Sequence, residues 1–557
     1  MPDINADLFD GSPRFSDPSL SAIASSGDVE GAWREALNSD VKAALQGVSG
    51  DFAVGIRQAS GRILMAVDRF AIRTLCYRMD GGKLRFAARA DELADANPEI
   101  DLQAIYDYLY FHVIPAPRTI YKGIHRLPPG HYAVFENGKL TVAQYWAPAF
   151  QEPGAASFDS LKAEFRQLLQ DAVTRQLDGG KPGCFLSGGT DSSTVSGMTA
   201  LASGKTAATY SIGFDAQGYD EMEFARIAAQ RFKTEHHEYY VTPADLVRSI
   251  PVVASHYDQP FGNSSALPSY YCAKMAREDG VTKILAGDGG DELFGGNTRY
   301  AKQRVFGFYD SIPGGLRSGL VEPVASLSML RRVPLVRKAA SYVNQAKMPM
   351  PDRMMTYNLL ERLGVDEVLT PAFVAQVDRR APAQQQREVW HESGKASLVN
   401  RMLAFDWRYT LAECDLPKVV GTTSLAGLNV GFPMLDDALL AFSQRLPTHY
   451  KLKGFQLRWF FKEALRGFLP DEIITKKKQG FGLPFGVWAN STPELKAMAT
   501  ESLQSLARRG VVRADFVQSL LIQRLPEHPG YYGEMVWILL MLEQWLAAKA
   551  PQFTLSH

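Results

Sequence analysis

The stretch CFLSGGTDSSTVSG, from Cys184 to Gly197, constrains the fold of this chain more than any other part of the sequence. An apolar run ends at Leu186, a turn with two glycines follows, and residues that suit a helix begin near Ser192. Glycines let backbone N–H groups approach a ligand closely, and the N-terminus of a helix attracts anions. The pattern predicts a strand, a turn and a helix, with a turn suited to phosphate or pyrophosphate. A polar turn that only caps a helix fits the same residues.

Asp191 in this turn adds a second constraint, because a carboxylate and a phosphate repel each other. The simplest arrangement that keeps both at one turn is a bridging Mg²⁺ ion. The chain has no Gly-x-x-x-x-Gly-Lys-[Ser/Thr] sequence, so the usual cradle for β- and γ-phosphates is missing. It also has no Gly-x-Ser-x-Gly sequence, which excludes that type of nucleophilic serine.

Strand and helix patterns alternate after the turn, which bounds the fold class. An amphipathic helix is expected from Leu161, and strands are expected at 208–214, 236–241 and 283–287, with a helix at 221–232. Such alternation predicts βαβ units and a parallel sheet. From about residue 300 to 546 the chain is expected to be mainly helical. The aromatic segment Tyr531–Leu546 is expected to be a packed helix, and a homodimer seam along it is left open.

Two further segments carry residues that suit phosphate chemistry. The turn GDGGDELFGG (Gly287–Gly296) follows an expected strand and contains Asp288, Asp291 and Glu292. Ligands of open α/β sheets bind at the carboxyl ends of strands, so two acidic turns there could share one Mg²⁺. The segment TKKKQGFGLPFGVW (Thr475–Trp488) places three lysines before a glycine-broken loop. Lysine stabilises a leaving pyrophosphate, although a lysine run alone is more typical of a solvated face.

The first 150 residues have a different character. Short apolar runs at 51–57, 62–68, 75–79 and 84–89 are separated by turn residues, and His131–Trp146 forms a hairpin pattern around Asn137-Gly138. These patterns predict stacked antiparallel sheets. Pro, Gly and Ser cluster in Gln151–Ser160, which predicts a linker. We therefore expect two domains, residues 1–150 and 151–557, in an α/β protein.

The charge balance and the cysteines limit the classes of partner. Sixty basic and sixty acidic residues cancel, so no net field favours nucleic acid or an anionic membrane. The four cysteines are widely spaced and show no metal-binding or redox spacing, which favours a reducing cytoplasm. No secretory signal pattern and no uninterrupted apolar stretch of membrane-spanning length is found. We expect a cytoplasmic protein with small-molecule substrates.

The three phosphate-type segments together resemble the asparagine synthetase family of glutamine-dependent amide-forming ligases. The family's motifs stand here as SGGTDSS (Ser187–Ser193), GDGGDELFGG and KQGFGLP (Lys478–Pro484). The first motif is shared with other ATP pyrophosphatases, and its combination with the second is specific to this family. The resemblance runs from about Asp51 to beyond Trp488. It implies an N-terminal antiparallel hydrolase-like β-sandwich and a C-terminal α/β domain of the adenine-nucleotide α-hydrolase type.

The resemblance also implies a two-step reaction that uses ATP and Mg²⁺. A carboxylate is adenylated with release of pyrophosphate, and ammonia or an amine then displaces AMP. Asp191 and Asp291 would hold Mg²⁺, and Lys478 would stabilise the adenylation transition state. Asp288 would orient the nucleophile or take its proton. Pyrophosphate would be bound by Ser187, Gly188, Gly189, Asp191 and Ser192, and the adenosine pocket would be lined by Ile212 and Gly287.

The sequence departs from the family at its glutaminase half. The family uses a cysteine as residue 2 to attack glutamine, whereas this chain has Pro2, and its nearest cysteine is Cys76. Nucleophilic catalysis requires the nucleophile, so we expect no glutamine hydrolysis. The family segments that hold glutamine are also missing. The N-terminal domain is expected to be degenerate, with a scaffold role for what remains of the sandwich.

A second departure concerns the acid that is activated. In DLPKVVGTTSLAGLNVGFPMLDD (Asp415–Asp437), Val420 and Gly421 replace an acidic-basic pair, and Asn429 and Gly431 replace Glu and Arg. Loss of charges beside the acceptor pocket weakens the case for aspartate. Larger or less charged acids remain open, as in the related β-lactam synthetases and lasso-peptide cyclases, or in amidation of a sugar acid.

Two rival functions remain at this stage. An RNA-modifying enzyme of the same ATP-pyrophosphatase type needs a catalytic cysteine pair and a basic face, and the neutral charge argues against it. A non-catalytic ATP-binding protein is disfavoured because Asp191, Asp291 and Lys478 are all present.

Overall fold

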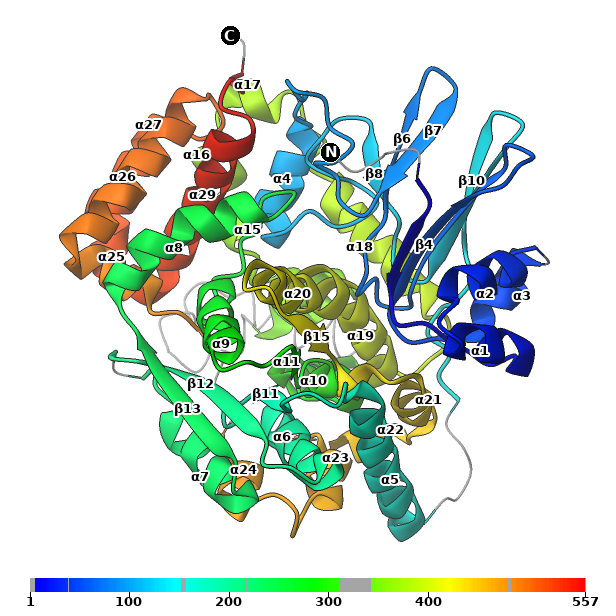
Figure 1. Ribbon diagram of the computed structural model, residues 1–557. Helices are drawn as coiled ribbons and strands as arrows, with labels where there is room; N and C mark the ends of the chain where they lie inside the picture. The colour runs from blue at the N-terminus through cyan, green and yellow to red at the C-terminus, as the bar shows by residue number, and fades with distance from the viewer. Residues whose placement is uncertain are drawn as a thin grey trace.

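The computed structural model describes residues 6–38, 40–151, 157–216, 218–310, 342–477 and 482–555. Antiparallel sheets formed by the N-terminal region lie on one side, a parallel sheet lies below the centre, and C-terminal helices pack on the other side (Figure 1). Within the described ranges, we find no helix with both the length and the apolar character needed to cross a bilayer.

A five-stranded parallel sheet forms the base for the turns described above. Its strands follow the order β13-β12-β11-β14-β15, and every neighbouring pair is parallel. The order reverses between β11 and β14, and ligands of open α/β sheets bind at such a reversal. The strands are β11 (Gly183–Phe185), β12 (Ala208–Phe214), β13 (Glu235–Val241), β14 (Lys283–Leu285) and β15 (Asn429–Gly431). The sequence predicts the first four of these strands but not β15.

Helices cover both faces of this sheet, which explains why β12 is buried at all seven of its positions. Helices α5, α6 and α7 lie on one face, and α8, α9 and α20 lie toward the centre of the molecule (Figure 1). Their bounds are α5 (Phe158–Gln176), α6 (Thr190–Ser203), α7 (Met222–Phe232), α8 (Pro243–His256), α9 (Ala266–Glu278) and α20 (Leu416–Leu425).

Helix α5 illustrates how the sequence produces one of these covering elements. Ser157 caps its N-terminus by accepting a hydrogen bond from the Ser160 backbone N–H. Leu161, Phe165 and Leu169 recur every four residues and are all buried, as the amphipathic pattern predicts. Of the predicted linker Gln151–Ser160, residues 152–156 lie outside the described residues, and residues 158–160 belong to α5 rather than to a linker.

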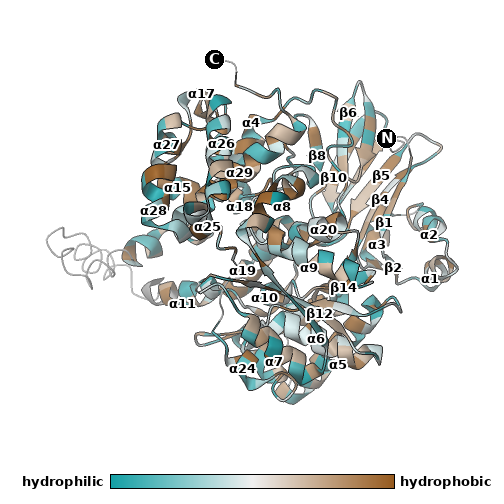
Figure 2. Ribbon diagram, turned by 60° about the vertical axis from the view of Figure 1, so that its left-hand side comes forward, coloured by the Kyte–Doolittle hydropathy of each residue, from teal (hydrophilic) through white to brown (hydrophobic). Residues whose placement is uncertain are grey.

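The N-terminal region contains the predicted antiparallel sheets. One has the order β1-β4-β5-β9-β10, and its strands β4 and β5 are strongly apolar (Figure 2). The other has the order β7-β6-β8. The strands are β1 (Leu8–Gly11), β4 (Phe52–Arg57), β5 (Ile63–Val67), β6 (Cys76–Asp80), β7 (Lys83–Ala87), β8 (Ile124–Arg126), β9 (His131–Glu136) and β10 (Lys139–Gln144), and two-residue strands β2 (Arg14–Phe15) and β3 (Val48–Ser49) form a separate pair.

Three short helices cover the outer face of the first sheet: α1 (Pro18–Ser25), α2 (Val29–Ala36) and α3 (Val41–Gln46). Trp33 of α2 is fully buried and packs its ring on Phe15 and Phe52 at centroid distances of 5.1 and 5.0 Å. This small core is separate from the main core of the molecule. The segment that precedes β4 is therefore folded and packed.

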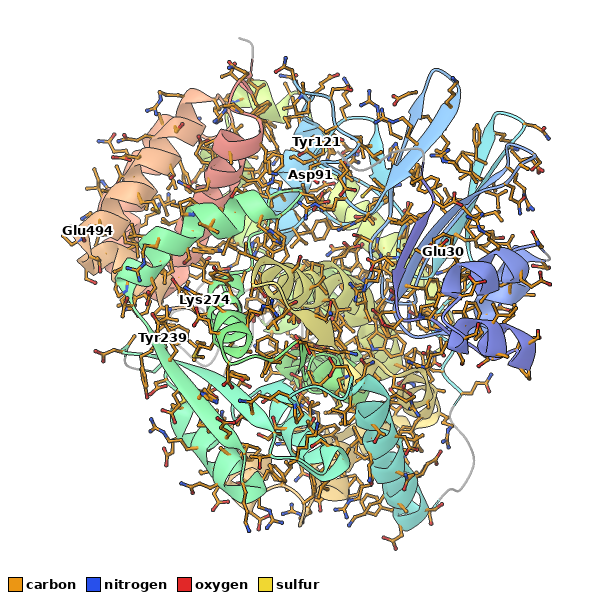
Figure 3. The ribbon with its side chains drawn as sticks, in the orientation of Figure 1. Glu30, Asp91, Tyr121, Tyr239, Lys274 and Glu494 are labelled. Carbon is orange, nitrogen blue, oxygen red and sulfur yellow. The ribbon has the colours of Figure 1, made fainter. Side chains whose placement is uncertain are left out.

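Helix α4 (Leu102–Phe111), together with Cys76 of β6 and Ile124 of β8, is buried in the same core as the C-terminal helices, whereas Tyr77, Leu84 and Phe86 of the second sheet pack in a core shared with the first sheet. Tyr108 donates a hydrogen bond to the backbone carbonyl of Ile538. Asp91 pairs with Lys549 at 3.2 Å and lies next to Tyr121, where the N-terminal region meets the last helix (Figure 3). The first 150 residues are therefore joined to the rest of the chain by continuous packing.

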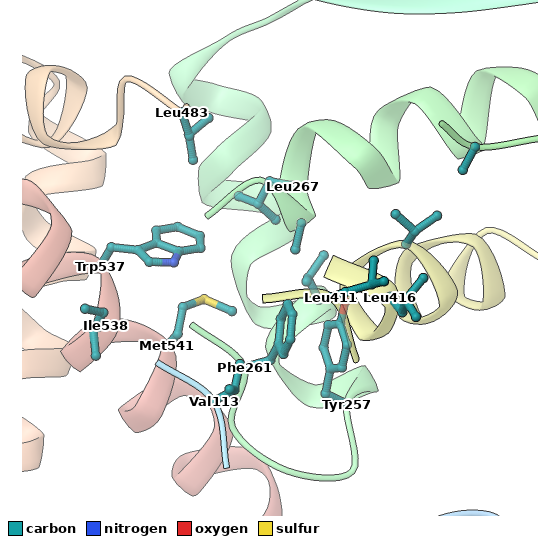
Figure 4. Packing of buried hydrophobic residues seen from close by; sticks show 14 of the residues in the cluster. Val113, Tyr257, Phe261, Leu267, Leu411, Leu416, Leu483, Trp537, Ile538 and Met541 are labelled. Carbon is teal, nitrogen blue, oxygen red and sulfur yellow. The ribbon is translucent and has the colours of Figure 1, made fainter. Parts of the chain in front are cut away.

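The predicted aromatic helix is α29 (Pro529–Lys549), and it runs through the main core. Trp537 points into the apolar cluster that includes Leu267 and Phe261 (Figure 4) and donates a hydrogen bond to the Gly262 carbonyl. Trp545 donates one to the Tyr257 carbonyl. Residues 535–542 are almost fully buried within the chain, so their side chains are not available to a second copy. Helices α25 (Phe485–Ser491) and α26 (Pro493–Arg508) pack against α29.

Candidate active site

A cavity of about 830 Å³ opens at the reversal of strand order. The turns after β11 and β14 form one wall, and residues 455–466 and 473–477 form another. Of the residues predicted for the site, those that line this cavity are Ser187, Gly189, Asp191, Ser192, Ile212, Gly287, Asp288 and Asp291. Lys478 lies outside the described residues.

The first turn is held in shape by its own serines. The hydroxyl oxygens of Ser187 and Ser192 are 3.0 Å apart, and the Ser187 backbone N–H donates to the Ser192 hydroxyl. Helix α6 then begins at Thr190 without a side-chain cap. Because the first N–H groups of a helix have no partner within it, they are available to an anion in the cavity.

Gly188 lies on the side of the first turn that packs against α7. Its φ is +71°, a conformation that favours glycine, and a side chain here would collide with the backbone of Phe224 and Ala225 in α7. Gly188 does not line the cavity, whereas Gly189 does. The first glycine therefore permits the tight turn and the close packing of α7, and the second faces the cavity.

The second turn packs directly on the first. Gly287 has no side chain, and a Cβ there would lie 2.7 Å from the Ser192 backbone nitrogen. The short helix α10 (Gly290–Phe294) follows and carries Asp291. This close packing brings Asp191 and Asp291 to the same part of the cavity, as the sequence predicts.

Arg458 joins these two aspartates and is a site residue that the sequence analysis missed. One guanidinium nitrogen, Nη1, donates to Asp191 at 2.8 Å and also to Asp291, while Nη2 donates to Asp191 as well. Arg458 is 5% exposed and follows the hairpin of β16 (Leu452–Lys453) and β17 (Gln456–Leu457). No sequence motif marks this position.

Other cations lie around the same wall of the cavity. Lys462 lies on α23 (Trp459–Ala464), and Lys476 pairs with Glu221 at 2.9 Å. Lys477 also lines the cavity, directly before the predicted Lys478. Two of the three lysines in the predicted run therefore face the cavity rather than forming only a solvated surface.

Asp288 lies at the other end of the second turn, beside Lys418. The Lys418 ammonium is 3.3 Å from Asp288 and 3.2 Å from Asp415. Burial disfavours the charge on Lys418, yet the two carboxylates hold the pKa of this ammonium above its usual range. Burial raises the pKa of the Asp288 carboxyl, and Lys418 opposes that rise. A positively charged lysine thus orients the predicted catalytic carboxylate.

A π-helical segment, η4 (Trp407–Asp415), supports this end of the cavity. π-Helical turns occur often at functional sites. The Trp407 indole donates to the Glu292 carbonyl at 2.9 Å, next to Asp291. Glu413, which is buried, accepts hydrogen bonds from Arg126 of β8 and from the Ala116 backbone. The N-terminal region therefore contacts the element that carries Asp415.

The sequence suggests that the segment after Lys418, which lacks the family's charged residues, lines the acceptor pocket, but most of it lies elsewhere. Of Asp415–Asp437, the described residues that line the cavity are Asp415, Lys418 and Val419. A side chain at Gly421 would overlap the ring of Tyr257, and Gly431 lies in β15 beside Leu285. The interpretation that residues 420, 421, 429 and 431 leave the acceptor pocket less charged is therefore not supported by their positions.

The two aspartates fit a divalent cation. Both contact the same guanidinium nitrogen of Arg458, so their oxygens converge on one point. Carboxylate oxygens are the ligands that Mg²⁺ prefers, and Mg²⁺ usually keeps several waters and shares substrate phosphates. Asp191 and Asp291 would hold such an ion at the mouth of the first turn.

A second acidic group in the described chain does not resemble a metal site. Glu235, His237 and Asp279 bring one ligand atom each within 4.8 Å of one another. The Lys181 ammonium already lies among them, 3.1 Å from Glu235 and 2.6 Å from Asp279. This arrangement is that of an ion-pair cluster with a lysine at its centre.

The chain's four thiols are enclosed. Cys76, Cys184 and Cys272 are buried, and Cys414 is half-buried. Burial raises the pKa of Cys76, places that of Cys184 at about 11, and raises that of Cys414 to about 12. A nucleophilic cysteine needs a thiolate, which these surroundings disfavour.

Comparison with known proteins places these features in a family. The sequence pattern of the family described as Asparagine synthase matches residues 164–547, and that of the Glutamine amidotransferase domain matches residues 21–146. The chain is 26% identical over 501 residues to "Asparagine synthetase [glutamine-hydrolyzing] 1" of Bacillus subtilis (strain 168), covering 89% of this chain and 77% of that protein.

Two further relatives show a similar extent of match. "Asparagine synthetase [glutamine-hydrolyzing] 3" of the same bacterium is 26% identical over 459 residues, which cover 78% of this chain and 67% of that protein. "Amidase chyE" of Penicillium rubens (strain ATCC 28089 / DSM 1075 / NRRL 1951 / Wisconsin 54-1255) is 24% identical over 518 residues, which cover 82% of this chain and 73% of that protein. The match to the synthase pattern spans more than half of the chain and includes both acidic turns, and the chain therefore belongs to the asparagine synthase family of ATP-dependent amide ligases.

Proposed function

We propose that the protein is an AMP-forming carbon–nitrogen ligase that adenylates a carboxylate and passes it to ammonia or an amine. The observation that carries this proposal is the set of residues that line one cavity. The two turns, the aspartates at their ends and several cations line its phosphate side, and the Asp288–Lys418 pair lies at its other end. This is the combination that pyrophosphate release and a following acyl transfer require.

In the first step, the substrate carboxylate attacks the α-phosphorus of ATP. The bond between the α-phosphorus and the oxygen that bridges it to the β-phosphate breaks, and pyrophosphate leaves. Ser187, Ser192 and the N-terminus of α6 would bind the departing pyrophosphate. A Mg²⁺ ion on Asp191 and Asp291 would supply charge neutralisation. Lys462, Lys476 and Lys477 add positive charge on the side toward which the pyrophosphate leaves. By its place in the same loop, Lys478 would contribute to this step.

In the second step, the nitrogen nucleophile attacks the acyl carbon, and AMP leaves with the electrons of the acyl–phosphate bond. Asp288 would accept the proton that the nitrogen loses. Its raised pKa favours proton uptake, and Lys418 holds it in place from 3.3 Å. Ile212 and Gly287 would form the adenosine side of the cavity, since both line it near the end of the sheet.

We further propose that the nitrogen comes from free ammonia or an amine and not from glutamine. The support is that all four thiols of this chain are enclosed, with pKa values raised above the range of a nucleophilic cysteine. The second N-terminal sheet instead contributes Cys76 and Ile124 to the main core, and its Arg126 contacts the segment that carries Asp415.

ATP–pyrophosphate exchange tests the first step. Purified protein is incubated with ATP, Mg²⁺, labelled pyrophosphate and one acid at a time from a panel of aspartate, glutamate, uronic acids and peptides. We expect exchange with at least one acid, and Asp291→Asn should abolish it. No exchange with any acid, combined with tight ATP binding, would favour a non-catalytic ATP-binding protein. Turnover that is equal with glutamine and with ammonia would contradict the proposed nitrogen source.

A further inference from the structure

Arg458 holds a central position between the two turns of the candidate site. It touches both carboxylates predicted to bind Mg²⁺, and its Nη1 donates to both of them. The guanidinium carbon also lies 4.3 Å from the centre of the Phe461 ring, within the range of a cation–π contact. Phe461 is fully buried, so it gives Arg458 a rigid support.

The backbone of Arg458 is fixed as well. Its φ of +55° is uncommon for a residue other than glycine, and such strained residues cluster at functional sites. Its N–H donates to the Lys451 carbonyl at 2.9 Å, and its carbonyl accepts from the Lys462 N–H at 3.0 Å. The main chain is therefore held at the junction of β17 and α23, and a change of position is confined to the side chain.

A divalent ion bridging Asp191 and Asp291 and the guanidinium of Arg458 need the same oxygen atoms. An ion at roughly 2.0–2.1 Å from these oxygens leaves no room for a nitrogen hydrogen-bonded to both. Resting on the function proposed above, we propose that Arg458 and Mg²⁺ bind the two aspartates in alternation. Arg458 neutralises the carboxylates until ATP arrives, and the metal then enters with the nucleotide.

The chemistry of the phosphates explains how Arg458 would be released. A guanidinium forms paired hydrogen bonds with phosphate oxygens as readily as with a carboxylate. The Arg458 guanidinium already contacts Asp191, the neighbour of Ser192 in the first turn, so a polyphosphate bound at that turn lies within its reach. The phosphates of the nucleotide can thus accept hydrogen bonds from Arg458, while the metal that enters with the nucleotide binds Asp191 and Asp291. The expected consequence is strong coupling between metal binding and nucleotide binding.

A metal titration without nucleotide tests this inference. Free Mn²⁺ is measured by electron paramagnetic resonance as it is added to the wild-type protein, to Arg458→Met and to Arg458→Lys. We expect weak Mn²⁺ binding by the wild type and at least tenfold tighter binding by Arg458→Met, with Arg458→Lys between them. Adding a non-hydrolysable ATP analogue should tighten Mn²⁺ binding at least tenfold for the wild type and much less for Arg458→Met.

Arg466→Met is the matched control, because Arg466 lines the same cavity but pairs with Glu463 and Asp471. This variant should bind Mn²⁺ as the wild type does. The double variant Arg458→Met/Asp191→Asn should lose the gain in Mn²⁺ affinity. That loss would show that the ion binds at Asp191. Equal Mn²⁺ affinity of the wild type and both Arg458 variants without nucleotide would overturn the inference. Because these titrations contain no carboxylic acid and no turnover, their failure is separate from a failure of the exchange assay.

Discussion

Lys418 offers a quantitative test of the acceptor end of the site. Its ammonium lies between Asp288 at 3.3 Å and Asp415 at 3.2 Å. In Lys418→Met the side chain keeps a similar length and apolar stem but loses its charge. The two carboxylates then face each other without a cation, and Asp288 loses the group that orients it.

The structure sets the size of the expected effect. With an effective dielectric constant of about 20, two unit charges 3.3 Å apart attract each other by about 5 kcal/mol before desolvation is subtracted. Removing one partner of a buried ion pair costs about 3–5 kcal/mol. The side chains of Lys418, Asp288 and Asp415 are 15%, 22% and 28% exposed, so water screens their interaction in part. We therefore expect Lys418→Met to lower the free energy of unfolding by about 2–3 kcal/mol.

Urea denaturation followed by circular dichroism measures this change. The control is Lys274→Met on the adjacent helix α9 (Figure 3), because Lys274 is half exposed and its contact with Glu278 is 4.0 Å long. The control should change stability by less than about 0.5 kcal/mol. Adding Asp415→Asn to Lys418→Met should recover part of the loss by removing the repulsion. A loss below about 0.5 kcal/mol for Lys418→Met itself would refute the buried-pair reasoning.

Two other predictions concern the thiols and the first turn. Because enclosure raises the thiol pKa values, native protein at pH 7.5 should react with iodoacetamide far more slowly than the same protein unfolded in urea; one fast-reacting thiol would contradict this. Gly188→Ala and Gly204→Ala both place alanine at a positive φ, +71° and +61°, but only position 188 is crowded. Gly188→Ala should therefore lower the free energy of unfolding by about 1–3 kcal/mol more than Gly204→Ala does. Equal losses for the two variants would show that α7 does not pack closely on position 188.

The parts of the fold that follow local patterns are predictable from the sequence. The turn at Ser187 and the turn at Gly287 each follow a buried strand, so the meeting of Asp191 and Asp291 follows from the geometry of a parallel sheet. The hairpin at residues 131–144 and helix α29 are confirmed for the same reason, since turn residues and a long apolar segment mark them.

The parts that depend on distant pairing are not predictable in this way. Strand β15 has only three residues, and it becomes a strand because it pairs with β14, far earlier in the chain. Arg458 lies 167 residues from Asp291 and belongs to no motif, so only the folded chain brings it to the site. The interpretation of Gly421 and Gly431 fails for the opposite reason. Their place in a motif suggests that they line the acceptor pocket, whereas Gly421 packs against Tyr257 and Gly431 pairs with β14.

The most direct test is a crystal structure with Mn²⁺ and a non-hydrolysable ATP analogue, with anomalous scattering used to locate the metal. We expect a Mn²⁺ peak between Asp191 and Asp291, with Arg458 turned away from both carboxylates. The β- and γ-phosphates should lie against Ser187 and the start of α6. A triphosphate bound elsewhere, or a metal peak that does not touch these aspartates, would show that the two turns are not the phosphate and metal site.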